Sequence, residues 1–251
     1  MKAMIFAAGL GTRLKPFTNT KPKALVEVDG TPMLGRVLLK IKETGVGDVV
    51  VNVHHFAQMI RDYLSANNNF GLNISISDES ETLLDTGGGL LAASGYLMGD
   101  EPIIVHNADI LTDFSLTEMV EAHVCNRADV TLLAQDRISS RTFVYDDSLR
   151  LRGWAKTETA ETIPTELDIS NLKSLAFGGV SVISPSIFPH LSKYAEEHGQ
   201  VFSTTPFYAS ECSHLNIIGY VAELDYRWFD IGKPENLLKA SESLSENQFL
   251  K

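Results

Sequence analysis

Cysteine is scarce in this sequence, and long apolar runs are missing. Two of the 251 residues are cysteines, Cys125 and Cys212, and neither belongs to a CxxC pair. Two isolated cysteines argue against a disulfide framework, so a reducing, cytoplasmic compartment is expected. No segment reaches the roughly 20 apolar residues that a membrane-spanning helix requires. The apolar run at residues 2–8 ends at glycine and arginine, which is too short for a signal peptide.

Basic residues are also in the minority. The chain has 21 Lys and Arg against 32 Asp and Glu, a formal net charge of -11 at pH 7. A general nucleic-acid surface needs a positive field, so neither nucleic acid nor membrane is expected as a partner. The apolar share of 44% is typical of a globular chain that buries a sizeable core.

Short apolar runs alternate with helical patterns in the first half of the chain. Residues 2–8, 48–53 and 102–109 read as buried strands, and residues 115–128 read as a helix. This alternation predicts an α/β, Rossmann-like fold with a mostly parallel sheet and helices on both faces. Ligands bind outside the carboxyl ends of such strands. The opening loop, the stretch around Asn52, and Asp109 should therefore converge there.

Residues 31–45 should form one of the covering helices. Thr31 is expected as its N-cap, Pro32 at its first helical position and Gly45 at its end. After about residue 142 the pattern changes to a hairpin, whose turn is expected at residues 146–148. Farther along, a pair of glycines interrupts a strand at residues 174–184, which predicts a bulge or a close approach of the backbone to a ligand.

The segment AAGLGTRLKPFTNTKPKAL is a basic loop in an acidic protein. It lacks a Walker A motif, and Leu14 stands where a dinucleotide fingerprint has its third glycine. Gly9 and Gly11 let backbone N–H groups approach phosphate oxygens closely. Arg13 adds a forked donor and Lys23 a point charge. The segment therefore predicts a site for a triphosphate, or for a phosphate beside a pyrophosphate.

This stretch resembles the signature GxGTRLxPxTxxxPKxL of the sugar-1-phosphate nucleotidyltransferases, also called nucleotide-sugar pyrophosphorylases. The resemblance continues through Asp109, the glycine pair and WFDIG, and so covers nearly the whole chain. It implies one nucleotidyltransferase domain over 1–251, with a nucleotide-binding core at about 1–135, a sugar-binding portion at about 136–229 and a closing segment at 230–251. The signature residues in register are Gly9, Gly11, Thr12, Arg13, Leu14, Pro16, Thr18, Pro22, Lys23 and Leu25.

The same resemblance assigns a metal to two aspartates. Asp109 closes the strand IIVHNAD, and Asp230 lies in WFDIG. The family more often has glycine where this chain has Ala108, a change that leaves the carboxylate in place. Mg²⁺ commonly takes one or two carboxylates together with substrate phosphates. The resemblance implies that Asp109 and Asp230 hold this Mg²⁺ jointly, with Arg13 and Lys23 as the catalytic cations.

A second glycine-rich segment, LLDTGGGLLAA, should sit at a loop-to-helix junction. Backbone amides freed by glycine can read the edge of a base, and a helix start favours anions. In the family this region contacts the base. The expected nucleotide-binding residues are Ala8, Gly9, Gly11, Thr12, Arg13, Thr86, Gly87 and Gly88.

Sugar recognition is expected from Lys156, Glu158 and Gly179. Gly179 matches the family's sugar-contacting strand. The segment GWAKTE resembles one that usually reads Glu-Lys-Pro, but Ala155 replaces the glutamate and Thr157 the proline. Lys156 survives, and Glu158 could substitute for the missing carboxylate. This departure argues against a standard glucose-1-phosphate thymidylyltransferase.

The expected reaction joins a sugar 1-phosphate to a nucleoside triphosphate and releases pyrophosphate. The TGGG segment is most similar to the N-acetylmuramate-1-phosphate uridylyltransferase and the mannose- or heptose-1-phosphate guanylyltransferase branches, with uridine slightly favoured. A phosphocholine cytidylyltransferase and a regulator with lapsed catalysis stay as alternatives. The adjacent histidines 54 and 55 are expected to be structural rather than metal-binding, because neighbouring side chains on a strand point apart. The oligomeric state is left open.

Overall fold

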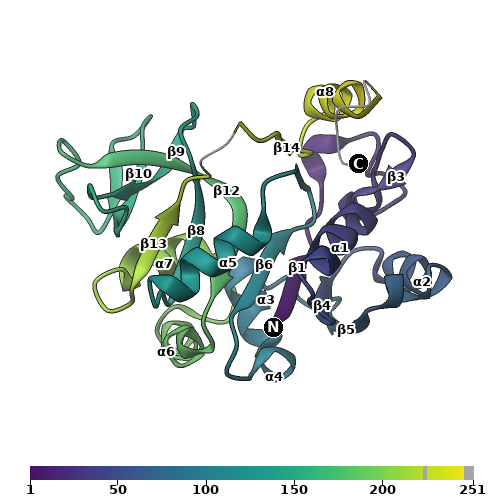
Figure 1. The fold of residues 1–251 in the computed structure, drawn as a ribbon, viewed down its shortest axis with the longest axis horizontal. Helices are drawn as coiled ribbons and strands as arrows, with labels where there is room; N and C mark the ends of the chain where they lie inside the picture. The colour runs from purple at the N-terminus through teal and green to yellow at the C-terminus, as the bar shows by residue number, and fades with distance from the viewer. Residues whose placement is uncertain (223–224, 246–251) are drawn as a thin grey trace. The chain divides into compact units, whose positions relative to one another are not determined.

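The computed structural model describes residues 1–222 and 225–245 (Figure 1). Its contacts divide the chain into two compact units. Unit 1 comprises Met1–Leu83, Val105–Leu116 and, of the described residues, 225–245. Unit 2 comprises Leu84–Ile104 and residues 117–222. The subdivision expected from the sequence, near residues 135 and 229, concerned binding roles and stays a prediction.

A sheet of apolar strands forms the centre of unit 1, in the order β6-β1-β4-β5 (Figure 1). β1 (Lys2–Phe6) pairs parallel with β4 (Asp48–Val53), and β4 pairs parallel with β5 (Asn73–Asp78). β6 (Ile103–Asn107) contributes its last three residues to this unit. The middle residues of β1 have no exposed surface, as expected of a parallel strand covered on both faces. The predicted α/β class is confirmed.

The helices of unit 1 are α1 (Met33–Glu43), α2 (Ala57–Ala66) and α8 (Pro234–Ser245). Each has an apolar stripe at helical spacing, which the sequence predicts. The end of the expected last helix, residues 246–250, lies outside the described residues. Short 3-10 turns span Thr12–Leu14 (η1), Lys23–Leu25 (η2) and Asn68–Gly71 (η3).

The expected start of α1 was wrong by one residue, since the helix begins at Met33 rather than Pro32. Pro32 is extended and precedes the helix, because it pairs with Glu27 in a two-stranded hairpin of β2 (Glu27–Val28) and β3 (Thr31–Pro32). Asp29 and Gly30 make the turn, with φ of 49° and 69°. Two consecutive positive φ angles are typical of the type I′ turn that joins tightly paired strands. The hairpin therefore uses Thr31 and Pro32 as strand residues, so Pro32 takes the N-cap position expected for Thr31 and the helix begins at Met33.

Unit 2 has its own strands and helices. β12 (Lys173–Ile183) pairs antiparallel with β8 (Val130–Gln135), and β8 pairs parallel with β13 (Ile217–Tyr220). The predicted hairpin is confirmed as an antiparallel pair of β9 (Arg141–Tyr145) and β10 (Leu151–Lys156). The remaining elements of this unit are α3 (Asp85–Ala92), α4 (Ser94–Leu97), α5 (Leu116–Cys125), β11 (Glu161–Ile163), η4 (Pro185–Ile187), α6 (Phe188–His198) and α7 (Thr204–Glu211).

The bulge predicted at the paired glycines is present in β12. The register of β12 against β8 shifts between Phe177 and Ser181, and Gly179 has a φ of 75°. A side chain at Gly178 would lie 3.2 Å or less from three atoms of Leu133, so this glycine allows close packing of the two strands. Gly178 and Gly179 are both buried. The glycine pair therefore bends a strand whose neighbours pack tightly against it.

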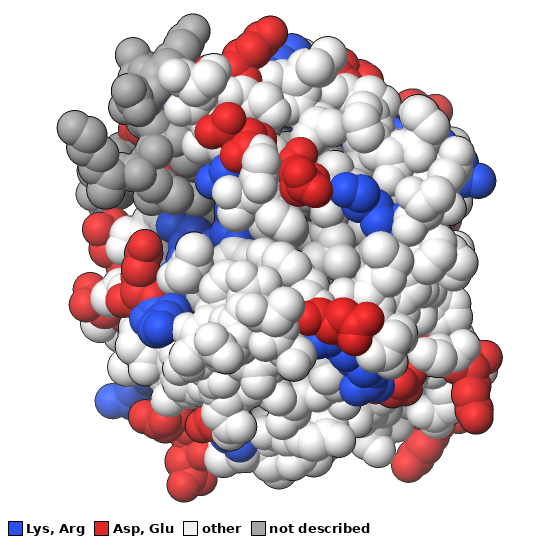
Figure 2. Space-filling view, turned by 90° about the vertical axis from the view of Figure 1, so that its right-hand side faces the viewer, with Lys and Arg blue, Asp and Glu red and all other residues white. Residues whose placement is uncertain are grey.

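Among the described residues, no helix is both long and apolar enough to span a lipid bilayer. On the face drawn in Figure 2, acidic and basic side chains of the described residues are interspersed rather than gathered by sign. This mixture follows from a composition in which both charges are common and acidic residues predominate.

Candidate active site

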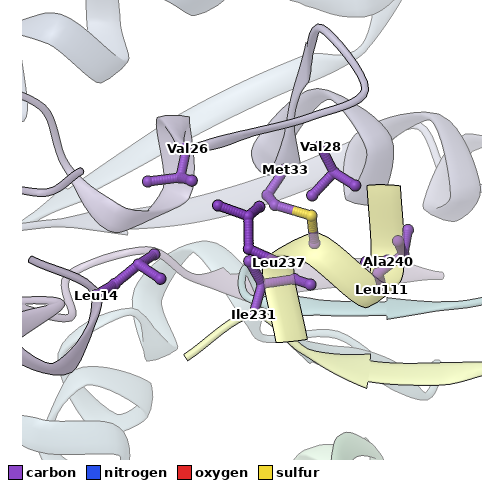
Figure 3. Packing of buried hydrophobic residues seen from close by; sticks show 8 residues of the cluster. All are labelled: Leu14, Val26, Val28, Met33, Leu111, Ile231, Leu237 and Ala240. Atoms are coloured by element: carbon purple, nitrogen blue, oxygen red, sulfur yellow. The ribbon is translucent and has the colours of Figure 1, made fainter. Parts of the chain in front are cut away.

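A buried apolar cluster in unit 1, shown in Figure 3, includes the chain neighbours of two predicted site residues. Leu14 follows Arg13 in the chain, and Ile231 follows Asp230. Leu14 has no exposed surface and Ile231 is 1% exposed. Burying one such side chain contributes about 1.5–3 kcal/mol, so the cluster fixes the backbone beside each charged residue. The cluster consists of Leu14, Val26, Val28, Met33, Leu111, Ile231, Leu237 and Ala240.

The phosphate loop, residues 7–25, turns sharply at Gly11. Gly11 has a φ of 64°, and its carbonyl accepts hydrogen bonds from the Leu14 N–H (2.9 Å) and the Thr18 hydroxyl (2.8 Å). A Cβ at Gly11 would lie 2.8 Å from Thr18 Cγ2 and 3.0 Å from Lys23 Cβ. Both the left-handed backbone and the crowding therefore require glycine at this position.

Gly9 has a different environment. It is exposed, and a Cβ built there would meet no atom within 4 Å. The packing of the protein therefore gives no reason for a glycine at this position. A glycine beside open space leaves room for a ligand to approach the backbone closely.

The two predicted metal-binding aspartates are neighbours in unit 1. β7 (Ile110–Thr112) pairs antiparallel with β14 (Trp228–Asp230), and Asp230 lies opposite Ile110. One residue beyond this pair, the Ile231 N–H donates to the Asp109 carbonyl at 2.8 Å. The Asn236 side chain donates to the Asp230 carbonyl at 2.8 Å, so the segment after β14 is held in place. Backbone pairing thus brings together two residues that lie far apart in the sequence.

Four predicted residues converge around Gly232. A Cβ at Gly232 would lie 2.7 Å from Asp230 Oδ1, 3.2 Å from Arg13 Nη2 and 3.3 Å from Lys23 Nζ. Lys23 Nζ also forms an ion pair with Asp109 Oδ2. Gly232 was not among the residues predicted from the sequence. Its signal is its place directly after the Asp-Ile pair, where a larger residue would intrude among the charged groups.

These four side chains form a compact set of two cations and two carboxylates. Lys23 and Asp109 are 13% and 23% exposed in their side chains, so their ion pair is partly shielded from water. Arginine and lysine side chains suit phosphate oxygens, and paired carboxylates suit a divalent cation. Within the part of the chain that the structure describes, no three His, Cys, Asp or Glu side chains are grouped to hold a metal. A metal here would need further ligands from substrate and water.

A buried histidine precedes this set on β6. His106 has no exposed surface, and its Nδ1 lies 2.8 Å from the Asn107 carbonyl. Burial lowers the pKa of His106 to about 4, because the charged imidazolium is disfavoured away from water. His106 is therefore neutral at physiological pH and contributes no charge to the site.

The second glycine-rich segment is packed within unit 2. α3 begins at Asp85, so the segment lies at the expected loop-to-helix junction, with Gly87 and Gly88 in the first turn of the helix. Their N–H groups donate to the Phe202 carbonyl at 2.8 and 3.1 Å. A Cβ at Gly87 would overlap the Phe202 ring, and one at Gly88 would overlap the Gln200 carbonyl. The expectation that the N–H groups of Gly87 and Gly88 are free was therefore wrong. Tight packing against residues 200–202 explains why both positions are glycine.

Thr86 is also engaged within unit 2. Its hydroxyl oxygen accepts a hydrogen bond from the Thr204 N–H at 2.9 Å, which ties the first turn of α3 to the start of α7. A nucleotide contact through other atoms of Thr86, Gly87 or Gly88 stays a prediction.

The predicted sugar-binding residues all belong to unit 2. Lys156 ends β10 and is partly exposed, Glu158 follows it in an exposed turn, and Gly179 is buried in the bulge of β12. Their contacts with a sugar stay predictions. In unit 1, His54 Nδ1 lies 2.6 Å from the Glu79 carbonyl, which gives His54 the structural role that was expected.

Comparisons with known proteins agree with this arrangement. The family model "Nucleotidyl transferase" matches residues 2–145. An N-acetylmuramate alpha-1-phosphate uridylyltransferase of Caulobacter vibrioides is 32% identical over 250 residues, 97% of this chain and 97% of that protein. A mannose-1-phosphate guanyltransferase of Yarrowia lipolytica is 28% identical, covering 96% of this chain and 63% of that protein. A UDP-glucose pyrophosphorylase structure with UDP-glucose gives a TM-score of 0.77 at 20% identity, covering 98% of this chain and 99% of that one.

The chain therefore belongs to the nucleotidyl transferase family. The resemblance of the opening segment predicted this membership, and the comparisons confirm it. The structural likeness at 20% identity shows the fold, a mostly parallel α/β sheet with helices, and confirms the fold class expected from the strand and helix pattern.

Proposed function

We propose that this protein is a sugar-1-phosphate nucleotidyltransferase. The observation that carries the proposal is the convergence of Arg13, Lys23, Asp109 and Asp230 around Gly232. Two cations beside two carboxylates meet the needs of two phosphate-bearing substrates and a divalent cation.

The reaction is an in-line displacement at the α-phosphorus of a nucleoside triphosphate. A phosphate oxygen of the sugar 1-phosphate forms the new P–O bond, and the bond between the α-phosphorus and the bridging oxygen breaks to release pyrophosphate. The attacking oxygen is already anionic, so no general base has to remove a proton. Positioning and neutralisation of charge then supply most of the catalysis.

Arg13 and Lys23 have separate roles in this proposal. Arg13 is exposed, follows the glycines of the phosphate loop, and offers a forked donor to the departing pyrophosphate. Lys23 is mostly buried and offers a point charge that steadies the sugar phosphate and the α-phosphate. In the structure, Lys23 is paired with Asp109. A substrate phosphate oxygen must therefore replace or share this carboxylate as the partner of Lys23.

We also propose Asp109 and Asp230 as ligands of Mg²⁺. Their donor set fits, because two carboxylates are a common protein contribution to a magnesium site that includes substrate phosphates. When bound, Mg²⁺ supplies positive charge that stabilises the phosphate oxygens. The pairing of β7 with β14 holds the two aspartate backbones in a fixed relation before substrate binds.

For substrates, we propose UTP and N-acetylmuramate 1-phosphate, and hence a role in nucleotide-sugar biosynthesis for the cell envelope. The uridylyltransferase at 32% identity over nearly the full length of both chains supports this choice. The second candidate is a mannose-1-phosphate guanylyltransferase, favoured by a relative at 28% identity that is matched over 63% of its length. Such reactions draw on cytoplasmic nucleotide pools, so we place the enzyme in the cytoplasm.

The proposal is tested by pyrophosphate release in the presence of Mg²⁺. Four triphosphates (UTP, GTP, CTP and dTTP) are each combined with N-acetylmuramate, mannose, heptose and glucose 1-phosphates and with phosphocholine. Turnover with UTP and N-acetylmuramate 1-phosphate is the expected result, and turnover with GTP and mannose or heptose 1-phosphate selects the second candidate. Turnover with CTP and phosphocholine alone would contradict the proposed acceptor. Nucleotide binding with no pyrophosphate from any pair would indicate a regulator with lapsed catalysis.

A further inference from the structure

Asn52 makes two hydrogen bonds to the first residues of the phosphate loop. It lies near the carboxyl end of β4, opposite Phe6 in the parallel register of β1 and β4. Its side-chain oxygen accepts from the Ala7 N–H at 2.7 Å and from the Ala8 N–H at 3.3 Å. Asn52 is 2% exposed, so these bonds lie within the protein rather than on its surface.

The other end of the Asn52 amide is held as well. Asn52 Nδ2 donates to Glu79 Oε1 at 2.7 Å, and Glu79 is 3% exposed. Glu79 is itself fixed, since its N–H donates to the Val53 carbonyl at 2.8 Å and its carbonyl bonds to His54 Nδ1 at 2.6 Å. The amide orientation follows from these partners, because its oxygen faces two N–H donors and its nitrogen faces a carboxylate. The Asn52 amide can therefore satisfy its hydrogen bonds in only one of its two flipped orientations.

These bonds lie at the point where β1 ends. β1 stops at Phe6, so the next two N–H groups have left the regular strand ladder, and both residues are buried. A buried N–H group without a partner is costly, and Asn52 supplies the partner for both. Immediately beyond them the chain reaches Gly9, where the backbone is exposed and open to a ligand. Asn52 thus fixes the place from which the ligand-facing part of the loop departs.

We infer that Asn52 is a positioning residue that sets the affinity of the phosphate loop for the nucleoside triphosphate. The inference rests on the proposed function, in which this loop holds the triphosphate. Small displacements of groups that position a reactant have large effects on its binding and reaction. Asn52 acts through the backbone of Ala7 and Ala8, and Glu79 acts through Asn52.

The first test is the substitution Asn52→Ala, assayed for both substrates. The KM for the nucleoside triphosphate should rise about tenfold, the equivalent of ~1.4 kcal/mol, and the KM for the sugar phosphate should change less. Unfolding midpoints are measured in parallel, and all assays are done at a temperature where every variant is folded. A loss of stability with an unchanged KM for the triphosphate would overturn the inference, because Asn52 would then serve the fold alone.

The second test uses Asn52→Asp, which keeps the shape but places a carboxyl beside Glu79. Two carboxylates at hydrogen-bond distance do not both ionise readily, so the pair takes up a proton as the pH falls. The shared proton restores a hydrogen bond between the two groups, and the second oxygen of the introduced carboxyl again accepts from the Ala7 N–H. The KM of Asn52→Asp for the triphosphate, divided by that of Asn52→Ala at the same pH, should therefore fall between about pH 8 and about pH 6. A ratio of the two KM values that stays constant over this pH range would contradict the proposed hydrogen bonding between residue 52 and Glu79.

Two control variants test whether the effects depend on the place of Asn52 in the structure or follow from any Asn→Asp change. Asn73→Asp makes the same change on an exposed pair, where Asn73 Nδ2 donates to Asp48 Oδ1 at 2.6 Å, and it should leave both KM values unchanged. Glu79→Gln keeps an acceptor oxygen for Asn52 Nδ2. Its KM for the triphosphate should therefore be closer to the wild-type value than that of Asn52→Ala. A rise in the KM for the triphosphate in Asn73→Asp equal to that in Asn52→Asp would overturn the inference.

Direct nucleotide binding distinguishes this inference from the proposed function. If the wild type binds UTP or GTP but releases no pyrophosphate, the proposed reaction fails, and Asn52→Ala should still weaken binding about tenfold. If the wild type turns over and Asn52→Ala binds the triphosphate as tightly as the wild type, the inference fails alone. If the wild type binds no triphosphate at all, both fail.

Discussion

The two glycine-rich segments look alike in the sequence but differ in structure. In the first, Gly11 is required by a left-handed turn, while Gly9 faces open space that the protein does not fill. In the second, Gly87 and Gly88 lie in α3 and are packed against Phe202 and Gln200, with their N–H groups already bonded.

This difference separates glycines that serve a ligand from glycines that serve packing. A glycine whose missing side chain would meet nothing is not required by packing, and in a loop that carries phosphate-binding cations it leaves room for a ligand to reach the backbone. A glycine whose side chain would overlap a neighbour is explained by that neighbour. Only the first segment also brings charged side chains of suitable chemistry together, at Arg13 and Lys23.

The largest expected effect concerns Lys23, the cation near the end of the first glycine-rich segment. Lys23→Ala should lower kcat by at least about 100-fold, because Lys23 is a positioned cation in a partly shielded site. The control is Lys21→Ala in the same loop, since Lys21 pairs with Glu27 at the surface and should change kcat little. Steady-state pyrophosphate release measures both. Near-normal turnover of Lys23→Ala would remove the main distinction between the two segments.

The next effect tests the second segment. Gly88→Ala should destabilise the fold by about 1–3 kcal/mol, because the added methyl group overlaps the Gln200 carbonyl. Gly95→Ala in α4 is the control, since its Cβ would meet nothing within 4 Å and should not destabilise the protein. Urea unfolding measures both. An unchanged midpoint for Gly88→Ala would show that packing does not explain this glycine.

A third effect concerns His106, a residue near the charged set that serves the fold. Its pKa is lowered to about 4 by burial, below the ordinary value of 6.5. Between these values the unfolded chain binds a proton that the folded chain does not, so stability falls as the pH drops. His106→Gln should reduce the loss of unfolding free energy between about pH 7 and pH 5 by about 1–2 kcal/mol. Chemical denaturation at both pH values provides the measurement, and equal losses in both proteins would contradict it.

The smallest expected effect returns to the open glycine. Gly9→Ala should leave the unfolding free energy within about 0.5 kcal/mol of the wild type, because the new methyl group meets no protein atom. It should raise the KM for the triphosphate about threefold, ~0.7 kcal/mol, because the methyl group lies between ligand and backbone. Urea unfolding and substrate titration measure the two quantities. A loss of stability without a change in KM would erase the contrast with Gly88.

Local patterns in the sequence predicted the central strands β1, β4 and β6 and pointed to the two cations of the candidate site. The strand over residues 48–53 was predicted from its four valines, and the structure gives β4 the same bounds. Arg13 and Lys23 were found because they stand at fixed spacing in one signature. Asp109 and Asp230 were assigned from the resemblance, and the structure adds the strand pairing that makes them neighbours.

Contacts between distant residues could not be predicted in the same way. The start of α1 was misplaced because the hairpin of β2 and β3 uses Pro32 as a strand residue. The bonds of Asn52 join residues about 45 positions apart and depend on the register of β1 and β4. The packing of Gly87 and Gly88 depends on Phe202 and Gln200, which lie more than 100 residues later in the chain. Each of these outcomes follows from tertiary packing rather than from local propensity.

The most direct test of the central claim follows the two ends of the triphosphate. UTP labelled at the α-phosphorus is turned over with N-acetylmuramate 1-phosphate and Mg²⁺, beside UTP labelled at the γ-phosphorus, and the products are separated. The α label should appear in the nucleotide sugar and the γ label in pyrophosphate, in equal amounts. Recovery of the γ label as inorganic phosphate, or of the α label as UDP, would show cleavage at another bond and would contradict this account of the phosphate loop.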